Sequence, residues 1–326
     1  MERVVIISGT SHFGLASSVA ERLGKECLLP KIFYYGTGDF EVVLPENVRR
    51  KLVFVIQSLL PSRRSACYHF LEALMIINAA HKASAEEVNV VVPHLGWDQS
   101  DKKWTGRMPI AGELIAAMFH WAGAKRYVGV HFHSPQFPGF FPMECVVDHL
   151  VADKLLIDYV TEQGLNRDAV LVAGDLGFSN MAHKIADRIG VPVVDVKKER
   201  LSGSEVVIRR IYGSVKNKRV ILWDDKIVKG TTMRAIVEEL VKQGAREFII
   251  VATHGLFTYS TIRNLSHPLI KEIIVTDTVP HSKYVKKALP LTEITIADLL
   301  ASAIREISIE GGSVSKLFKG STVSKE

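Results

Sequence analysis

The sequence has few cysteines, no long apolar run and no local excess of basic residues. Only Cys27, Cys67 and Cys145 occur among its 326 residues. Their odd number and wide spacing argue against a disulfide framework and against a cysteine-based zinc site. We therefore expect a protein of the reducing cytoplasm. No run of about 18 consecutive apolar residues is present, so we expect no membrane-spanning helix.

Positive charge is present, but it is spread along the chain. Lys and Arg total 41 against 35 Asp and Glu, which leaves a net charge of +6. Nucleic-acid binding needs a localised basic stripe, and here most basic residues have acidic neighbours. We expect no nucleic-acid partner, although the net charge permits ligands that carry phosphate.

The composition and the apolar pattern favour a globular α/β protein. Hydrophobic residues make up 47% of the chain and charged residues 23%, which is ordinary for a folded protein. Short runs rich in Val, Ile and Leu alternate with helical patterns, as is typical of parallel sheets buried on both faces. We expect strands at 4–7, 52–56, 88–92, 127–130, 170–173, 191–194, 220–223, 248–251 and 272–275. The first of these is interpreted as a strand rather than as part of a signal peptide.

The chain is long enough for two domains at about 150 residues each, and an internal match favours two related halves. Residues 122–133 and 243–254 both contain a helix end, a Gly-Ala-basic turn, a strand and a histidine. The alternative is coincidence, because the helix-to-strand unit is common. We place the domains at 1–152 and 153–326, with the join in the helix-rich stretch that follows residue 150.

The segment 220–233 contains the most informative group of polar residues. Two carboxylates follow a predicted strand, and a basic residue, a glycine and two threonines precede a helix predicted at 234–242. Carboxylates can accept hydrogen bonds from ribose hydroxyls, while glycine lets the backbone approach a phosphate and a helix N-terminus donates to it. We expect a sugar-phosphate site at Asp224, Asp225, Lys229, Gly230, Thr231 and Thr232. The alternative is an acidic turn that caps a helix.

These residues carry a family resemblance. Asp224 to Thr232 resembles the phosphoribosyl diphosphate loop of type I phosphoribosyltransferases, in a form similar to that of amidophosphoribosyltransferases. Those enzymes need an N-terminal cysteine, which Met1-Glu2 does not offer. From end to end, however, the chain resembles the ribose-phosphate diphosphokinases (phosphoribosyl diphosphate synthetases), especially their archaeal type. The motifs that occur in the family's order are Ser8-Gly9, Leu15-Ala16, Phe54–Ser58, Gly139–Phe141, Thr253–Gly255, Val275–Thr278 and Ser313–Phe318.

The resemblance implies a fold, a reaction and a set of partners. The fold would be two related type I phosphoribosyltransferase-like domains with mostly parallel sheets. The reaction would transfer diphosphate from ATP to the anomeric hydroxyl of ribose 5-phosphate, giving phosphoribosyl diphosphate and AMP, with Mg²⁺ as cofactor. The N-terminal domain would hold the nucleotide and the C-terminal domain the ribose 5-phosphate. Because the family places adenine between subunits, a homo-oligomer is also implied.

The resemblance further implies catalytic and metal-binding residues. The family's catalytic Lys-x-Arg pair falls on Lys198 and Arg200, for which the alternative is a solvated, charged hairpin. The family's metal ligands fall on His133 and Asp175. Taken alone, the pair His131 and His133 is more often a local polar pair than a magnesium site, because Mg²⁺ prefers oxygen ligands.

The nucleotide side departs from the family pattern. Where the family has the signature Ala-Arg-Gln-Asp, this chain has Asp-Gln-Ser-Asp at 98–101. Neutral Gln99 thus replaces an arginine that contacts nucleotide phosphates, whereas Asp101 is kept. In the adenine-contacting loop, Tyr35 and Asp39 keep an aromatic ring and a carboxylate. We therefore assign nucleotide binding to Tyr35, Asp39, Gln99 and Asp101. The family's Asn-Asp-Asn stretch is replaced at 67–69, and His131 replaces an aspartate.

Two other functions stay open at this point. A non-catalytic, synthetase-associated subunit that binds ribose 5-phosphate would account for Gln99, Ser100 and His131, but Lys198 and Arg200 argue against it. A phosphoribosyltransferase that consumes phosphoribosyl diphosphate is favoured only by the loop 229–232.

Overall fold

The computed structural model describes residues 1–173, 179–202 and 205–318, which belong to two compact units. Unit 1 comprises Met1–Val151, Thr278–Pro280 and Thr295–Lys319, and unit 2 comprises Ala152–Asp277 and His281–Ile294. The chain passes from unit 1 to unit 2 between Val151 and Ala152, whereas the sequence places the boundary between 152 and 153. Residues 295–318, which the prediction places in the second domain, cluster with unit 1. No helix in the described part of the chain is both long and apolar enough to cross a membrane.

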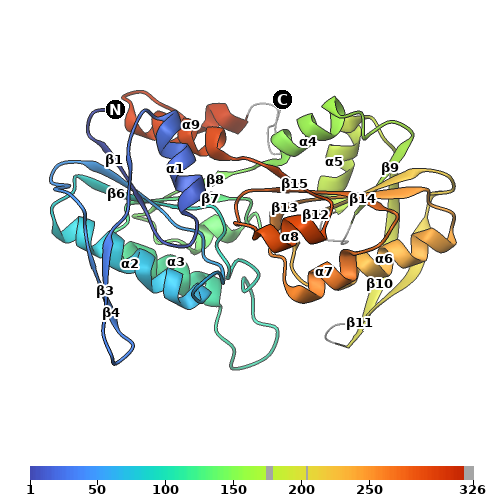
Figure 1. Ribbon diagram of the computed structural model, residues 1–326, viewed down its shortest axis with the longest axis horizontal. Helices are drawn as coiled ribbons and strands as arrows, with labels where there is room; N and C mark the ends of the chain where they lie inside the picture. Colours follow the sequence, from blue (N-terminus) through green and yellow to red (C-terminus); the bar gives the residue numbers. More distant parts are fainter. Residues whose placement is uncertain (174–178, 203–204, 319–326) are drawn as a thin grey trace. The chain divides into compact units, whose positions relative to one another are not determined.

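Unit 1 is built on a six-stranded sheet in the order β2-β1-β5-β6-β7-β8, in which all neighbouring strands run parallel. Strands β3 and β4 form a separate antiparallel hairpin that projects from the unit (Figure 1). The elements of the first 151 residues are β1 (Val4–Ser8), α1 (Phe13–Arg22), β2 (Cys27–Leu28), β3 (Lys31–Tyr34), β4 (Phe40–Val43), β5 (Leu52–Ile56), α2 (Ala66–Lys82), β6 (Glu87–Val92), α3 (Ala111–Ala122), β7 (Arg126–Val130), η1 (Phe137–Phe140) and β8 (Val146–Leu150). Helix α9 (Ala297–Ser308) packs against α1, and η3 (Val314–Phe318) follows it.

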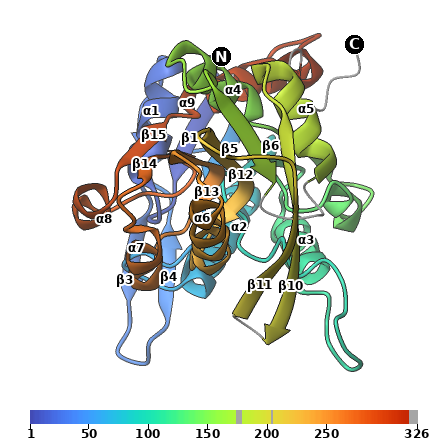
Figure 2. The same ribbon diagram turned by 90° about the vertical axis from the view of Figure 1, so that its right-hand side faces the viewer.

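Unit 2 is built on a seven-stranded sheet in the order β11-β10-β9-β12-β13-β14-β15. All of its pairs are parallel except β10 and β11, which form the long antiparallel hairpin seen in Figure 2. Its elements are α4 (Asp153–Glu162), β9 (Ala169–Ala173), α5 (Ser179–Ile189), β10 (Val193–Ser202), β11 (Glu205–Tyr212), β12 (Arg219–Ile227), α6 (Thr231–Lys242), β13 (Glu247–Gly255), α7 (Tyr259–Leu265), β14 (Ile270–Thr276), α8 (Lys283–Ala288) and β15 (Leu291–Ile294). The predicted α/β class with mostly parallel sheets is confirmed.

The two sheets share one strand order, but the internal sequence match does not reflect it. In unit 1 the first strand, β1, lies between β2 and β5, and in unit 2 the first strand, β9, lies between β10 and β12. Beyond β5 and β12 the later strands follow in sequence order toward the edge of the sheet. By this order β7 is equivalent to β14. The matched segments 122–133 and 243–254 lead into β7 and β13, which hold different places. Their likeness is therefore a coincidence of two helix-to-strand turns, and the relation between the units rests on topology.

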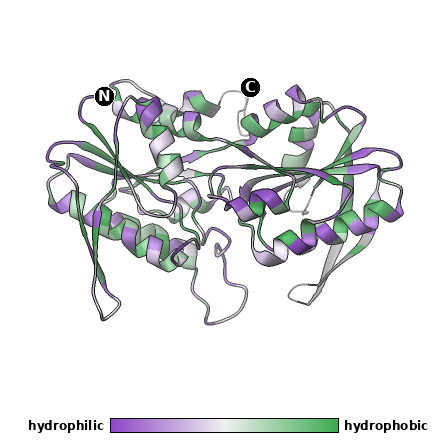
Figure 3. Ribbon diagram, viewed as in Figure 1, coloured by the Kyte–Doolittle hydropathy of each residue, from purple (hydrophilic) through white to green (hydrophobic). Residues whose placement is uncertain are grey.

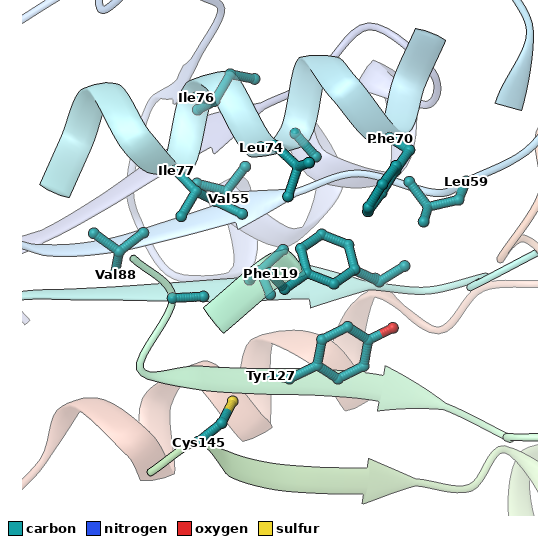
Figure 4. Close-up of a cluster of buried hydrophobic side chains, with 14 of the residues drawn as sticks. Val55, Leu59, Phe70, Leu74, Ile76, Ile77, Val88, Phe119, Tyr127 and Cys145 are labelled. Atoms are coloured by element: carbon teal, nitrogen blue, oxygen red, sulfur yellow. The ribbon is translucent and has the colours of Figure 1, made fainter. Parts of the chain in front are cut away.

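The cores follow from the apolar pattern of the sequence. All five residues of β9 are buried, as expected for a parallel strand covered on both faces. The helices show hydrophobic bands that alternate with hydrophilic ones (Figure 3), because only one side of each packs on a sheet. In unit 1, side chains of α2 and α3 pack onto β5, β6 and β7, with Phe119 and Tyr127 among the largest (Figure 4).

Phe119 provides a test of the unit 1 core. Its ring is fully buried and lies 5.3 Å from the ring of Phe70 and 5.5 Å from that of Tyr127, measured between centroids. We expect Phe119→Ala to lower the free energy of unfolding by about 3–5 kcal/mol, because it leaves a cavity in a packed core. Leu114→Ala, on the same helix but 51% exposed, is the control and should stay within about 0.5 kcal/mol of the parent. Chemical denaturation measures both, and equal losses would contradict the assignment.

Candidate functional site

Each sheet has one place at which the strand order reverses. In unit 1 it lies between β1 and β5, and in unit 2 between β9 and β12. Loops that leave neighbouring parallel strands in opposite directions open a crevice beyond the carboxyl ends of those strands, where ligands bind. The predicted sugar-phosphate loop follows β12 directly, so the topology puts it at the reversal point of unit 2. Asp175, a predicted metal ligand, lies outside the described residues.

The two predicted carboxylates lie within β12 and not after it. The strand continues to Ile227, with Asp224 opposite Ala252 and Ile227 opposite Gly255 on β13. Successive residues of a strand point to opposite faces, so the two acids do not share one face. Asp225 is buried and Asp224 is half-buried. The Asp224 carboxylate accepts a hydrogen bond of 2.9 Å from the backbone N–H of Asp225.

The glycine and the threonines of the loop meet at the start of α6. Gly230 is the N-cap residue, with a left-handed φ of 71°, a conformation that costs glycine little. The helix begins at Thr231, three residues earlier than predicted, so Thr231 and Thr232 lie in its first turn. The first N–H groups of a helix lack partners within it, and they attract anions. The structure thus brings Lys229, which is exposed, together with Gly230 and both threonines beside an anion-binding helix end.

The predicted catalytic pair belongs to the β10–β11 hairpin. Lys198 pairs with Ile208 and Arg200 with Val206 across the hairpin, with register shifts on either side of this stretch. Both residues therefore lie within β10.

In unit 1 a buried hydrogen-bond network occupies the equivalent reversal point. The side-chain amide of Gln57, which follows β5, donates to Glu72 on α2 at 2.5 Å. Its carbonyl oxygen accepts from both the backbone N–H and the hydroxyl of Ser11, which follows β1. Glu72 also accepts from the N–H and hydroxyl of Thr10. A Cβ atom at Gly9 would lie 2.3 Å from the Gln57 side chain. The loops after β1 and β5 are therefore tied together, and polar side chains fill the space between them.

This network was missed from the sequence. Gln57 and Ser58 were identified only as part of a family motif, and the acid that completes the network comes from a helix. His69 and Glu72 are three residues apart on α2, with Nδ1 and Oε2 separated by 3.4 Å. The i,i+3 spacing of a histidine and a glutamate was the available signal.

The nucleotide-side predictions fall on two parts of unit 1. Tyr35 and Asp39 are exposed residues of the turn between β3 and β4. The Tyr35 hydroxyl donates to Glu41 at 2.8 Å, and this hydrogen bond raises the pKa of Tyr35. Gln99 and Asp101 lie in the segment between β6 and α3. The structure gives no contact between these two pairs.

The segment of Gln99 does meet the predicted metal ligand of unit 1. Asp98 is buried, and its carboxylate accepts a hydrogen bond of 3.3 Å from the backbone N–H of His133. His131 is buried with a left-handed φ of 49°, whereas His133 is exposed. Among the described residues, no three His, Cys, Asp or Glu side chains gather closely enough to hold a metal ion. Within this part of the chain the two histidines therefore do not belong to a group of three possible ligands.

An aromatic and arginine cluster beside the β3–β4 hairpin was also missed. The hydroxyls of Tyr34 and Tyr68 lie 2.9 Å apart, and the guanidinium carbon of Arg64 lies 5.0 Å and 5.4 Å from the centres of their rings. Burial and the Tyr34 hydrogen bond raise the pKa of Tyr68. These distances are within the range of cation–π attraction. The sequence showed Arg64 close to residues 67–69, but it gave no sign that the hairpin returns to α2.

A histidine fixes the end of β13, the strand that pairs with β12. Nε2 of His281 lies 2.6 Å from the carbonyl oxygen of Gly255, and Nδ1 lies 2.7 Å from a carboxylate oxygen of Glu293 on β15. The ring thus lies between a backbone acceptor on β13 and a carboxylate on β15. Lys286 also pairs with Glu293. Burial favours a higher pKa for Glu293, but the hydrogen bonds from His281 and Lys286 outweigh it and lower that pKa.

Two family models match the chain. Residues 4–123 match a model described as the N-terminal domain of ribose phosphate pyrophosphokinase. Residues 205–319 match one described as the phosphoribosyl synthetase-associated domain.

Curated relatives and a solved structure cover nearly the whole chain. A ribose-phosphate pyrophosphokinase of Caldanaerobacter subterraneus subsp. tengcongensis is 36% identical over 96% of this chain and 97% of its own length. One from Aquifex aeolicus is 33% identical over 98% and 100%. The crystal structure of phosphoribosylpyrophosphate synthetase from Mycobacterium smegmatis superimposes with a TM-score of 0.85 at 34% identity, covering 93% of this chain and 98% of that one. These relatives are bacterial and do not support the archaeal-type likeness.

Glu293 should make unit 2 sensitive to acid. Because its pKa is lowered in the folded protein, its contribution to stability is present above the ordinary carboxyl pKa of 4.5 and is lost as the pH falls through the lower folded value. We expect Glu293→Gln to lower the melting temperature at pH 7, and we expect the gap from the parent to narrow below pH 4.5. Exposed Glu310→Gln is the control and should follow the parent throughout. A gap that does not change between pH 7 and pH 3.5 would contradict this role.

Proposed function

The chain belongs to the ribose-phosphate pyrophosphokinase family, and we propose that its own substrates are ATP and ribose 5-phosphate. The reaction is the transfer of diphosphate from ATP to the anomeric hydroxyl of ribose 5-phosphate, which gives phosphoribosyl diphosphate and AMP. The bond from the anomeric oxygen to the β-phosphorus forms, the bond from the β-phosphorus to the oxygen that leaves with AMP breaks, and the hydroxyl proton is released. The fold is of the type I phosphoribosyltransferase kind. Similarity over almost the full length favours this activity over a regulatory subunit or a phosphoribosyltransferase.

The single observation that carries the site is the position of the 228–232 loop at the reversal point of unit 2. We assign the 5-phosphate to the backbone N–H groups and hydroxyls around Gly230, Thr231 and Thr232, where the helix dipole favours an anion. Lys229 adds a positive charge. The carboxylates of Asp224 and Asp225 are assigned to the ribose hydroxyls. They lie on the strand that leads directly into this loop.

Catalysis is assigned to Lys198 and Arg200 of the hairpin. Phosphoryl transfer asks a protein mainly for positioning and for positive charge where the anionic oxygens develop. A lysine and an arginine two residues apart on one strand supply that charge from a single element.

The nucleotide is assigned to Tyr35, Asp39, Gln99 and Asp101, in the predicted N-terminal domain of residues 1–152, and the ribose 5-phosphate to the domain of residues 153–326. The loss of an arginine at position 99 removes one charge-assisted contact to phosphate. A homo-oligomer and a cytoplasmic location complete the proposal, as the family resemblance and the low cysteine content indicate.

Mg²⁺ is proposed to enter with the nucleotide. Magnesium sites of this kind use substrate phosphates and waters with one or two protein groups. Such a site does not need three protein ligands, and the described residues hold no group of three. His133 and Asp175 remain the predicted protein contacts. The ion would neutralise charge on the ATP phosphates.

The catalytic assignment is tested by following ³¹P NMR signals with ribose 5-phosphate, ATP and Mg²⁺. The parent should form phosphoribosyl diphosphate and AMP in equal amounts. Lys198→Ala and Arg200→Ala should each lower kcat about a hundredfold or more, because each removes charge stabilisation in the transition state. Exposed Lys216→Ala is the control. A parent that forms no product with any nucleotide donor, while a known synthetase works alongside, would overturn the proposed activity.

The nucleotide assignment is tested by restoring the missing charge. Gln99→Arg should lower the KM for ATP about tenfold or more, since a hydrogen bond to a charged group contributes about 1.5–3 kcal/mol. The KM for ribose 5-phosphate should not change. Gln99→Met, which adds no charge, is the matched control. An unchanged KM for ATP in both variants would place Gln99 outside the nucleotide site.

A further inference from the structure

Helix α7 holds the 228–230 segment from one side through two buried side chains. The hydroxyl of Thr261 donates to the carbonyl oxygen of Val228. One turn further on, the side-chain amide of Asn264 donates to the carbonyl oxygen of Lys229 at 2.8 Å. Thr261 is fully buried and Asn264 is 7% exposed. Two successive carbonyl groups of the loop therefore point to one helix.

The start of α7 makes the Thr261 hydroxyl available for this contact. Thr258 and Thr261 form a capping box, in which Thr261 Oγ1 accepts a hydrogen bond of 2.9 Å from the backbone N–H of Thr258. The Thr258 hydroxyl also lies 3.0 Å from Thr261 Oγ1. A hydroxyl oxygen can accept both of these hydrogen bonds while its own hydrogen points toward Val228. The helix cap thus sets the direction of a bond to a different loop.

A second contact fixes how near the loop lies to α7. Gly230 approaches the helix so closely that a Cβ atom there would lie 3.1 Å from the side chain of Leu265. Leu265 is fully buried, so it has little room to move. The loop is therefore fixed against α7 at three successive residues, 228, 229 and 230.

The direction of the Val228 and Lys229 carbonyl groups determines where the next backbone N–H groups point. In a trans peptide the C=O of one residue and the N–H of the next point in opposite directions within one plane. Since the carbonyls of Val228 and Lys229 point to α7, the N–H groups of Lys229 and Gly230 point away from it. Those two donors precede the N–H groups of the first turn of α6. Consecutive N–H groups that point the same way form a concave binding site for anions.

We propose that Thr261 and Asn264 are positioning residues for the phosphate of ribose 5-phosphate. They act through the loop, by holding two of its carbonyl groups so that the following N–H groups face the ligand. This inference rests on the proposed function, because it takes the loop to be the ribose 5-phosphate site. It adds that the anion affinity of the loop depends on a helix whose two side chains do not meet the substrate.

The test separates the hydroxyl from the shape of the side chain. Thr261→Val keeps the shape but removes the donor, whereas Thr261→Ser keeps the donor. Thr261→Val and Asn264→Ala should each raise the KM for ribose 5-phosphate about five- to tenfold, the effect of losing one hydrogen bond that orders the site. The KM for ATP should not change and kcat should fall less, and Thr261→Ser should stay within about twofold of the parent. Ser266→Ala is the matched control, because it removes a hydroxyl bond to Ile262 on the same helix.

A second readout needs no turnover. In protein labelled with ¹⁵N-glycine, the Gly230 amide signal should shift in Thr261→Val without ligand, and inorganic phosphate should move it less than in the parent. A KM for ribose 5-phosphate within about twofold of the parent in both Thr261→Val and Asn264→Ala, with an unmoved Gly230 signal, would overturn the inference and leave the proposed function intact. If Lys229→Ala and Gly230→Ala also leave that KM unchanged, the loop is not the ribose 5-phosphate site, and the proposed site falls together with the inference.

Discussion

Parallel strand pairing is the constraint on which this molecule depends. In a strand buried on both faces, the backbone N–H and C=O groups must form hydrogen bonds to neighbouring strands. Charged side chains are excluded from its middle, because an unpaired buried charge costs several kcal/mol. In β12 the residues from Val220 to Trp223 are all buried and apolar, and the acids come only at the end that extends past β9. Polar groups therefore collect where parallel strands end. The reversal of strand order then decides which of those ends opens a crevice.

The two units show how one topology supports different chemistry. At the reversal point of unit 1, Glu72 and Gln57 join the two loops, and Gly9 is glycine because the Gln57 side chain lies where a Cβ atom would be. At the reversal point of unit 2, Gly230 caps the start of α6, and side chains of α7 donate hydrogen bonds to carbonyl oxygens of the loop. A buried carboxylate such as that of Glu72 repels a phosphate, whereas oriented N–H groups attract one. The proposed phosphate site of unit 2 therefore depends on its loop, and the shared strand order alone does not supply it.

The sequence predicted the central strands well, because continuous Val and Ile runs leave few alternatives. It failed where polar residues continue an element. Strand β12 extends through two aspartates, which are rare in strands, because the ladder to β13 continues alongside. Helix α6 includes Thr231 and Thr232, although both were expected in the loop, because Gly230 already caps the helix.

The contacts that support the site could not be read from the sequence at all. Thr261 and Asn264 lie more than thirty residues from the carbonyls that they hold. The Gln57–Glu72 pair and the Tyr34–Tyr68 pair likewise join different elements. Single-sequence patterns report neighbours along a helix or a strand, whereas these pairs exist only because the topology brings separate loops and helices together.

The departures on the nucleotide side gain a physical interpretation from this arrangement. They concentrate in unit 1, at Gln99 and His131, while the lysine and arginine proposed for catalysis lie on the β10–β11 hairpin of unit 2. A lost charged contact to phosphate weakens binding about ten- to a hundredfold, but it does not remove a group that acts on the transferred phosphoryl. Buried Asp98, which holds the backbone of His133, would also repel a nucleotide phosphate. In the proposed assignment these substitutions change the affinity for the donor nucleotide, while Lys198 and Arg200, proposed for the transfer step, are kept, so donor preference is the property in which this chain should differ from its relatives.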